Sequence, residues 1–443
     1  MKLFVPPLEI SLDQGFTRET DLFGRGKFGE TLFEVVSGAD ESFVLALDAP
    51  WGEGKTVFAR MWAGYVKKQG GTAIYFDAFA NDYLSDPFVA LATQVYELLE
   101  KEDAEDAKKF VDLAKKAGRI VTRIGIKALT GVALDGTVIE DAGVADDISE
   151  EGAEAIDKIL ERRITGAQED RATIDAFRSF LENYAEEGGS EFPLIFIIDE
   201  LDRCRPDYAL EILENIKHLF NVPSVIFVLV VNRSQLEESI RSKYGSGVDA
   251  TKYLQKYVSI WANLPASRGV SRSQRADYVR RCLEAMRGDD SGSINLINNY
   301  SSTITELVEH FDSSLREIER CLTNFAIIVN ATKSDIAPDY ASIAVIVSVL
   351  KVTRPHLYSK MRVSKASYEE VLAETDFSKL NDAGWEHRPE GSYLRFILKL
   401  YLSEVEERKK MLEETSEYFR EDFGRAEDVI PIVCGWLDAF SRR

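Results

Sequence analysis

The chain has 443 residues, a length that suggests two or three domains. Its composition, 45% hydrophobic and 29% charged, is that of a globular protein. Its formal net charge of −21 argues against a broad, sequence-independent grip on nucleic acid, because such binding needs a basic surface. No stretch reaches the roughly 20 apolar residues of a membrane-spanning helix, and the N-terminus lacks the apolar segment of a signal peptide.

The four cysteines and four histidines are scattered along the chain. The cysteines form no CxxC pair and the histidines lack the spacing of metal ligands, so neither a zinc site nor a disulfide framework is indicated. We expect these side chains to be structural, and the cysteine usage suits a reducing cytoplasm. The residues are Cys204, Cys282, Cys321, Cys434, His218, His310, His356 and His387.

The stretch 49–56 reads Ala-Pro-Trp-Gly-Glu-Gly-Lys-Thr and lies between a predicted buried strand, 43–47, and a predicted helix, 57–68. A strand, a glycine-rich turn, Lys-Thr and a helix form a phosphate-binding loop, whose backbone N–H groups face an anion. Lys55 is expected to reach the β- and γ-phosphates, and Thr56 to ligate Mg²⁺. The other predicted nucleotide contacts are Pro50, Trp51, Gly52, Glu53, Gly54 and Val57.

One departure from the usual loop pattern is Ala49, which stands where the first glycine is expected.

Further along, residues 72–76 predict a second strand and residues 87–99 a helix that begins with proline. Asp77 and Asn81 lie between them, where either a role in the site or a turn-capping role is open.

Residues 100–190 predict a helical insertion. Within it, the stretch 118–134 is apolar and carries Arg119, Arg123 and Lys127 at a spacing of four. Such a stripe can lie on a membrane surface or on a partner protein, or belong to an ordinary packed helix.

An unbroken apolar run, 192–198, ends in Asp199 and Glu200. This pattern predicts a fully buried parallel strand with its acids at the carboxyl end, which beside a phosphate loop is the Walker B arrangement. Asp199 is the expected Mg²⁺ ligand, and Glu200 is placed to polarise the attacking water. Two adjacent buried carboxylates are costly unless a cation offsets them, and Mg·ATP supplies one.

A further buried strand, 224–231, ends at Asn232, which is a candidate to orient the water or the γ-phosphate. Residues 252–264 are expected to lead off the core. The fold class that follows is α/β, a P-loop NTPase αβα sandwich with a parallel sheet. The expected parts are a core (1–99 and 191–265), a helical insertion between Walker A and Walker B (100–190), a helical lid (266–335) and a helical C-terminal domain (336–443).

Residues 266–443 show no convincing strand, so an all-helical C-terminal region is expected. Ser314 is a predicted helix cap. Arg316, in the first turn behind it, is a candidate γ-phosphate contact, with Arg320 one turn further; a solvated helix arginine is the alternative.

Two motifs together resemble the KAP family of P-loop NTPases, relatives of the AAA+ and STAND ATPases. They are Pro-Trp-Gly-Glu-Gly-Lys-Thr at 50–56 and Ile-Asp-Glu-Leu-Asp-Arg-Cys-Arg-Pro at 198–206. The resemblance covers residues 15–335. It implies that the ligands are ATP and Mg²⁺ and that the segment at Arg25 covers the adenine of the nucleotide. The catalytic residues that it implies are Lys55, Glu200, Asn232, Arg203 and Arg316. Arg203 or Arg205 would act in cis, or in trans as an arginine finger.

The resemblance implies ATP hydrolysis that drives a conformational or assembly change, and several bacterial members of the family act against phages. The alternative is a nucleotide-dependent scaffold with negligible hydrolysis. The expected partners are ATP and either a second copy or a protein effector, with nucleic acid undecided. The expected location is the cytoplasm, with peripheral contact to the inner membrane left open because the apolar piece of the insertion is too short to span.

Overall fold

The computed structural model describes two compact units. One comprises Ile10–Pro50 and Lys55–Pro265, here called the sheet unit; the other comprises Met1–Glu9, Trp51–Gly54 and Ala266–Arg443, here called the helical unit. The described residues are 1–39, 41–84, 86–130, 150–187, 192–265, 272–288, 291–332, 336, 338–380, 392–414 and 429–439.

The sheet unit is built on five parallel strands in the order β2-β3-β4-β1-β5. Its centre is formed by the apolar runs of β3, β4 and β1, and every residue of β4 is buried. This confirms the predicted α/β fold with a parallel sheet. The strands are β1 (Val44–Asp48), β2 (Ala73–Asp77), β3 (Leu194–Asp199), β4 (Val225–Val231) and β5 (Ile260–Asn263).

Strand β5 was not expected from the sequence, which predicted that residues 252–264 lead off the core. Ile260–Asn263 pairs with β1 at the edge of the sheet, and its residues are exposed or half-buried. A short edge strand with one solvated side carries no long apolar run, so the pattern that marks the central strands is absent here.

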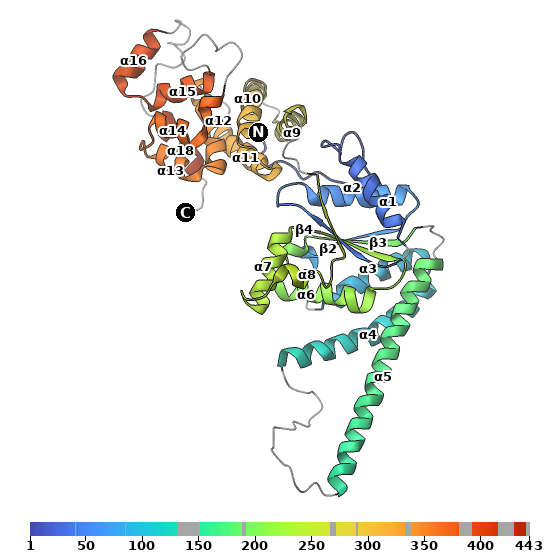
Figure 1. The fold of residues 1–443 in the computed structure, drawn as a ribbon. Coiled ribbons are helices and arrows are strands. Elements are labelled where there is room, and N and C mark those ends of the chain that lie inside the picture. The colour runs from blue at the N-terminus through green and yellow to red at the C-terminus, as the bar shows by residue number, and fades with distance from the viewer. Residues whose placement is uncertain are drawn as a thin grey trace. The chain divides into compact units, whose positions relative to one another are not determined.

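Helices cover both faces of the sheet (Figure 1). One face packs against α1 and α2 through a core that includes Trp62 and Ile197, and the other face packs against α3, α6, α7 and α8 through a core that includes Phe196 and Phe227. These helices are α1 (Gly26–Ser37), α2 (Lys55–Lys68), α3 (Pro87–Glu102), α6 (Pro206–Asn215), α7 (Arg233–Tyr244) and α8 (Ala250–Leu254), with short turns η1 (Phe79–Asn81), η2 (Leu201–Arg203) and η3 (Ile216–Phe220).

The insertion consists of two long helices, α4 (Ala104–Thr130) and α5 (Glu150–Glu187), which extend away from the sheet in Figure 1. Their bases are fixed by aromatic packing: Phe177 of α5 contacts Phe88 and Phe110 at centroid distances of 5.6 Å each, and Phe220 at 5.5 Å. The basic residues of the predicted stripe, Arg119, Arg123 and Lys127, lie in α4, whereas the end of the apolar stretch 118–134 falls in residues 131–149, which lie outside the described residues.

No helix in the described ranges is both long and apolar enough to cross a membrane.

The described part of residues 266–443 is helical, as predicted. Its centre is α12, in which Ala341–Leu350 is buried without interruption. Within this part of the chain, residues 393–402 and 405–413 form two separate helices, because the chain is extended at Ser403 and Glu404 between them. The helices are α9 (Arg272–Met286), α10 (Ser291–His310), α11 (Leu315–Ala331), α12 (Pro338–Thr353), α13 (Pro355–Arg362), α14 (Tyr368–Thr375), α15 (Tyr393–Leu402), α16 (Val405–Glu413) and α18 (Val429–Asp438), with a turn η4 (Phe377–Lys379).

Candidate active site

The predicted phosphate loop connects β1 to α2. Gly52 and Gly54 have φ values of +86° and +76°, in the left-handed region that favours glycine. Ala49 is not among the residues with positive φ; it is buried, and its N–H donates to the carbonyl of Val231 at the end of β4 (3.1 Å). An alanine therefore fits this position without strain, although the usual loop pattern has glycine there.

Lys55 is the first residue of α2 and is 8% exposed. Its ammonium group donates to the carbonyl oxygens of Ala49 (2.7 Å) and Pro50 (3.3 Å), so the side chain curls back over the loop. Burial lowers the pKa of Lys55, and the carboxylates of Asp202 and Asp199 oppose that effect. The loop thus presents a buried cation next to its backbone N–H groups, which is the chemistry that a phosphate needs.

Asp199, the last residue of β3, is completely buried. Its Oδ1 accepts from the N–H of Glu200 and its Oδ2 from the hydroxyl of Tyr75, both at 2.9 Å. Burial raises the pKa of Asp199 to about 6, although hydrogen bonding from Thr56, Tyr75 and the N–H of Glu200 favours the carboxylate. Its negative charge is therefore held where a nearby cation would stabilise it.

Glu200 has φ +60°, a left-handed conformation that is uncommon for a residue with a Cβ. Its Oε1 accepts from the Thr56 hydroxyl (3.3 Å), and its Oε2 forms an ion pair with Arg203 Nη1 (2.9 Å). Burial raises the pKa of Glu200, and Arg203 partly opposes this. A strained backbone at a half-buried acid beside a phosphate loop is typical of a functional site.

The side chains of Thr56 and Asp199 fit a magnesium ion, because both offer hard oxygen ligands and Asp199 is a fully buried carboxylate beside the loop. In the described residues, no group of three or more His, Cys, Asp or Glu side chains could hold a metal on its own. This set agrees with Mg²⁺, which is usually bound by one or two protein groups together with phosphates and water.

Strand β4 lies between β1 and β3, so Asn232 follows a strand that ends between the phosphate loop and Asp199. Its Oδ1 accepts from the Ser234 hydroxyl (2.8 Å). The next residue, Arg233, donates its backbone N–H to the carboxylate of Asp48 (2.8 Å), the last residue of β1. The ends of the two strands are thereby joined.

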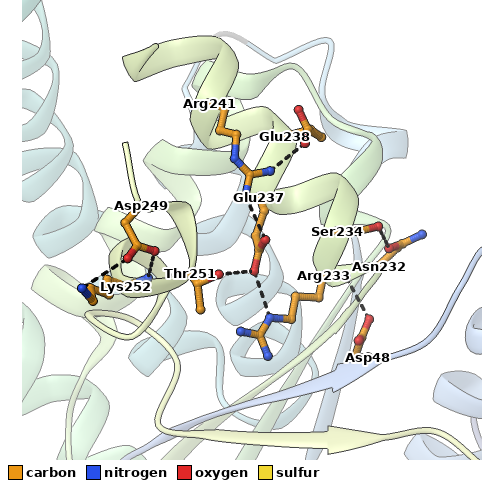
Figure 2. Close-up of polar contacts among 10 residues, drawn as sticks. All are labelled: Asp48, Asn232, Arg233, Ser234, Glu237, Glu238, Arg241, Asp249, Thr251 and Lys252. Carbon is orange, nitrogen blue, oxygen red and sulfur yellow. Dashed lines mark hydrogen bonds and ion pairs between the residues drawn. The ribbon is translucent and has the colours of Figure 1, made fainter. Parts of the chain in front are cut away.

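Figure 2 shows that Glu237 connects this strand end to α8. Its carboxylate accepts from Arg233 Nε (3.0 Å), Arg241 Nη2 (3.2 Å) and the Thr251 hydroxyl (2.9 Å). The Arg233 guanidinium also lies 4.6 Å from the ring centroid of Trp261 on β5. This cluster was not predicted, since charged residues at helical spacing are usually a solvated face.

At the end of β2, Asp77 and Asn81 form a local turn. The Asp77 carboxylate accepts from the N–H of Ala80, and the Asn81 amide donates to the Asp77 carbonyl, both at 2.8 Å. These bonds are those of the turn-capping alternative. Next to this turn, Asp82 pairs with Arg205 Nε (2.9 Å) and also accepts from its backbone N–H (2.9 Å).

The remaining predicted site residues lie as follows. Arg25 is buried beside α1, where its N–H donates to Asp21 (2.8 Å). Arg316 lies in the first turn of α11, behind a capping box formed by Ser314 and Glu317. Within the helical unit, which includes Trp51–Gly54, a Cβ on Gly52 would lie 2.8 Å from that of Arg316.

The other loop positions differ in exposure: Glu53 is buried, Val57 is half-buried, and Pro50 and Trp51 are exposed.

A parallel sheet with a glycine-rich loop after β1 and an Asp-Glu pair after β3 defines the class of P-loop NTPases. The comparison with family models gives the particular family. The model described as the KAP family P-loop domain matches residues 25–332, and the chain belongs to this family.

A search of curated proteins found no significant match. Among solved structures, the chain is similar to the ORC2 protein of Aeropyrum pernix in its ADPNP–ADP complexes, at 14% identity, a TM-score of 0.35 and 94% coverage of each chain. It is also similar to Cdc6p from Pyrobaculum aerophilum, at 13% identity and a TM-score of 0.35, with coverage of 95% of this chain and 96% of that one. At these values the likenesses carry no argument about function.

Proposed function

We propose that this KAP-family protein binds and hydrolyses Mg·ATP and acts as a nucleotide-driven conformational or assembly switch. The observation that carries the proposal is the contact between the two motifs: the Thr56 hydroxyl of the loop donates to the Glu200 carboxylate at 3.3 Å, next to the buried Asp199. Residues 144 positions apart are thereby brought together in the arrangement that phosphoryl transfer requires.

The proposed roles follow from the chemistry of each group. Bound Mg²⁺ would supply charge neutralisation on the β- and γ-phosphates, with Thr56 and Asp199 holding it. Lys55 and the N–H groups of the loop stabilise the phosphate oxygens. Glu200 accepts the proton of the attacking water, and Asn232 orients that water. We assign Arg316 to contact with the γ-phosphate, and Arg203 to stabilisation of charge in cis or in trans.

The Arg203–Glu200 ion pair favours a second candidate function. A carboxylate whose two oxygens already accept from Thr56 and Arg203 is a weaker base toward water. A protein fixed in this state would bind nucleotide and recruit a partner with negligible hydrolysis. An intact Glu200 weighs toward hydrolysis, because pure binding does not need this residue.

Two substitutions test the proposal. Lys55→Ala should abolish ATP binding, whereas Glu200→Gln should retain binding and lower turnover by about 10²- to 10⁴-fold, the usual contribution of a general base. The readouts are equilibrium binding of ATP and phosphate release, with Lys68→Ala, an exposed lysine on the same helix, as the control. Wild-type turnover in Glu200→Gln would contradict the base assignment. Binding without any phosphate release in the wild type would favour the scaffold.

The switch itself is tested by the mass of the protein in solution with and without ATP, where an ATP-dependent increase supports an assembly that supplies an arginine in trans. The family resemblance leads us to extend the proposal to bacterial defence against phages or to signalling. Phage plating on cells that carry the wild type or Lys55→Ala tests this extension, which requires protection by the wild type alone.

A further inference from the structure

Both oxygens of Asp199 are engaged before any ligand is considered. The N–H of Glu200 occupies Oδ1, and the hydroxyl of Tyr75 occupies Oδ2, each at 2.9 Å. The first donor is backbone and belongs to the same motif. The second is a side chain from another strand, and neither the sequence nor the proposed mechanism assigns it a function.

The register of the sheet explains why Tyr75 reaches this carboxylate. Strand β2 runs parallel to β3, with Tyr75 opposite Ile197 and Asp77 opposite Asp199. Residues two apart on a strand share a face, so Tyr75 and Asp199 are diagonal neighbours on one face of the sheet. Ile197 and Tyr75 belong to the core between the sheet and α2, which places this pair on the α2 side.

Helix α2 in turn holds the tyrosine. The guanidinium carbon of Arg60 lies 5.1 Å from the centroid of the Tyr75 ring, a cation–π contact from the helix that begins with Lys55 and Thr56. The contacts therefore run from Arg60 to Tyr75 and from Tyr75 to Asp199. The helix that carries the loop's own ligands thus also fixes the carboxylate on β3.

We propose that Tyr75 is a positioning residue for the magnesium site: its hydroxyl fixes the rotamer of Asp199, and Arg60 holds the ring in place. This inference rests on the proposed function. Hydrogen-bond donors behind a metal ligand typically change metal affinity or activity by 10- to 100-fold when removed, because they orient the ligand. Tyr75 does not touch the nucleotide in this assignment and acts through Asp199.

The test is Tyr75→Phe, which removes the hydroxyl and keeps the ring. The affinity of a non-hydrolysable ATP analogue is measured with Mg²⁺ and with EDTA, and the ratio of the two dissociation constants reports the contribution of the metal. We expect that ratio to fall about tenfold in Tyr75→Phe, with the affinity in EDTA unchanged within twofold. The control is Tyr96→Phe, which removes a phenol–carboxylate hydrogen bond to Glu100 (2.7 Å) on the exposed side of α3.

The possible outcomes separate this proposal from the one it rests on. If the wild type shows no effect of Mg²⁺ on nucleotide affinity, both proposals are overturned. If the wild type shows the effect and Tyr75→Phe keeps the full ratio, only the positioning role is overturned. Equal losses with Mg²⁺ and with EDTA would indicate a merely structural tyrosine and would likewise overturn it.

A second variant keeps the proposal testable if Tyr75→Phe does not fold, as judged by circular dichroism. Arg60→Met keeps an apolar side chain against the Tyr75 ring and removes the charge. We expect a two- to fivefold fall in the same ratio, smaller than that of Tyr75→Phe, because one cation–π contact contributes about 0.5–1 kcal/mol. An unchanged ratio in Arg60→Met would then contradict the proposed chain of contacts.

Discussion

The cores of the two units differ in what they bury. The sheet unit buries Lys55, Asp199 and Asp202 at the carboxyl edge of its sheet. In the described residues from α9 to α18, the buried charged side chain is Arg275, which pairs with Asp312 at 3.1 Å, and the other buried polar residues are Ser and Thr. The sheet core therefore carries charges whose desolvation costs free energy, whereas the buried polar groups from α9 to α18 are nearly all neutral. The helical unit also includes the buried loop residue Glu53.

This difference separates residues that serve stability from residues that serve chemistry. A buried charge that lacks full compensation lowers stability and persists where a ligand needs it, whereas an apolar core gains from every methylene group. Substitutions should therefore act in opposite directions in the two regions: truncation in the helical core should destabilise, and neutralisation at the sheet edge should stabilise while abolishing function.

The largest effect is expected for Ile346→Ala in α12. Ile346 is fully buried in the helix at the centre of the helical unit, so its truncation should leave a cavity and cost about 2–5 kcal/mol. Urea unfolding followed by circular dichroism measures the loss. The control is Ile432→Ala on α18, where the side chain is 40% exposed and the expected cost is below about 1 kcal/mol. Equal costs at the two positions would contradict the difference between core and surface.

A smaller effect of opposite sign is expected for Asp199→Asn. The pKa of Asp199 is raised from 3.8 to about 6 in the folded protein, which at neutral pH corresponds to about 3 kcal/mol that opposes folding. Asparagine removes the charge but cannot accept both existing hydrogen bonds equally well, so the expected gain in the free energy of unfolding is about 1–3 kcal/mol at pH 7.5. Mg²⁺-dependent nucleotide binding should be lost at the same time.

The pH dependence of the free energy of unfolding tests whether the charge of Asp199 causes this gain. Because the folded state holds the Asp199 proton more tightly, it binds more protons than the unfolded state between pH 3.8 and about 6, and the wild type loses stability as pH rises through that window. The gain from Asp199→Asn should therefore be largest above pH 6 and vanish toward pH 4. Asp112→Asn, at an exposed position on α4, should change stability little at any pH. A gain that is independent of pH would rule out charge as its cause.

The sequence predicted the parts of the fold that are encoded locally. The central strands are unbroken apolar runs, and the phosphate loop is set by glycines and by the Lys-Thr pair, so both could be recognised from short windows. Strand β5 could not, because its pairing with β1 depends on a distant partner rather than on its own four residues. The sequence of α12 is an apolar run whose spacing does not distinguish a helix from a strand, since a helix buried on all sides lacks the amphipathic pattern.

The candidate site was predictable at the level of residue identity and not at the level of contacts. Asp199 and Glu200 could be recognised because they are acids at the end of an apolar strand. Tyr75, by contrast, resembles any other strand residue in the sequence, and it becomes a partner of Asp199 only through the register of β2 on β3. The ion pair of Arg203 with Glu200 depends on the turn at η2 and on the left-handed backbone of Glu200. Neither feature has a local sequence signal.

The smallest effect is expected for Arg205→Ala, and it decides between the two arginines that the resemblance offered as fingers. Arg205 is 62% exposed, and its Nε and Nη2 are bound by the carboxylate and carbonyl of Asp82. An exposed pair of this kind contributes about 0.2–1 kcal/mol, and Asp82 keeps the backbone N–H of Arg205 after truncation. We therefore expect unfolding to change by less than about 1 kcal/mol and phosphate release by less than threefold. Arg203→Ala, which removes the charge stabilisation assigned to Arg203, should lower phosphate release by at least tenfold, and a rise would instead indicate that the ion pair with Glu200 restrains hydrolysis. A loss of 10³-fold or more in Arg205→Ala would instead identify Arg205 as the finger, since that is what such a residue contributes.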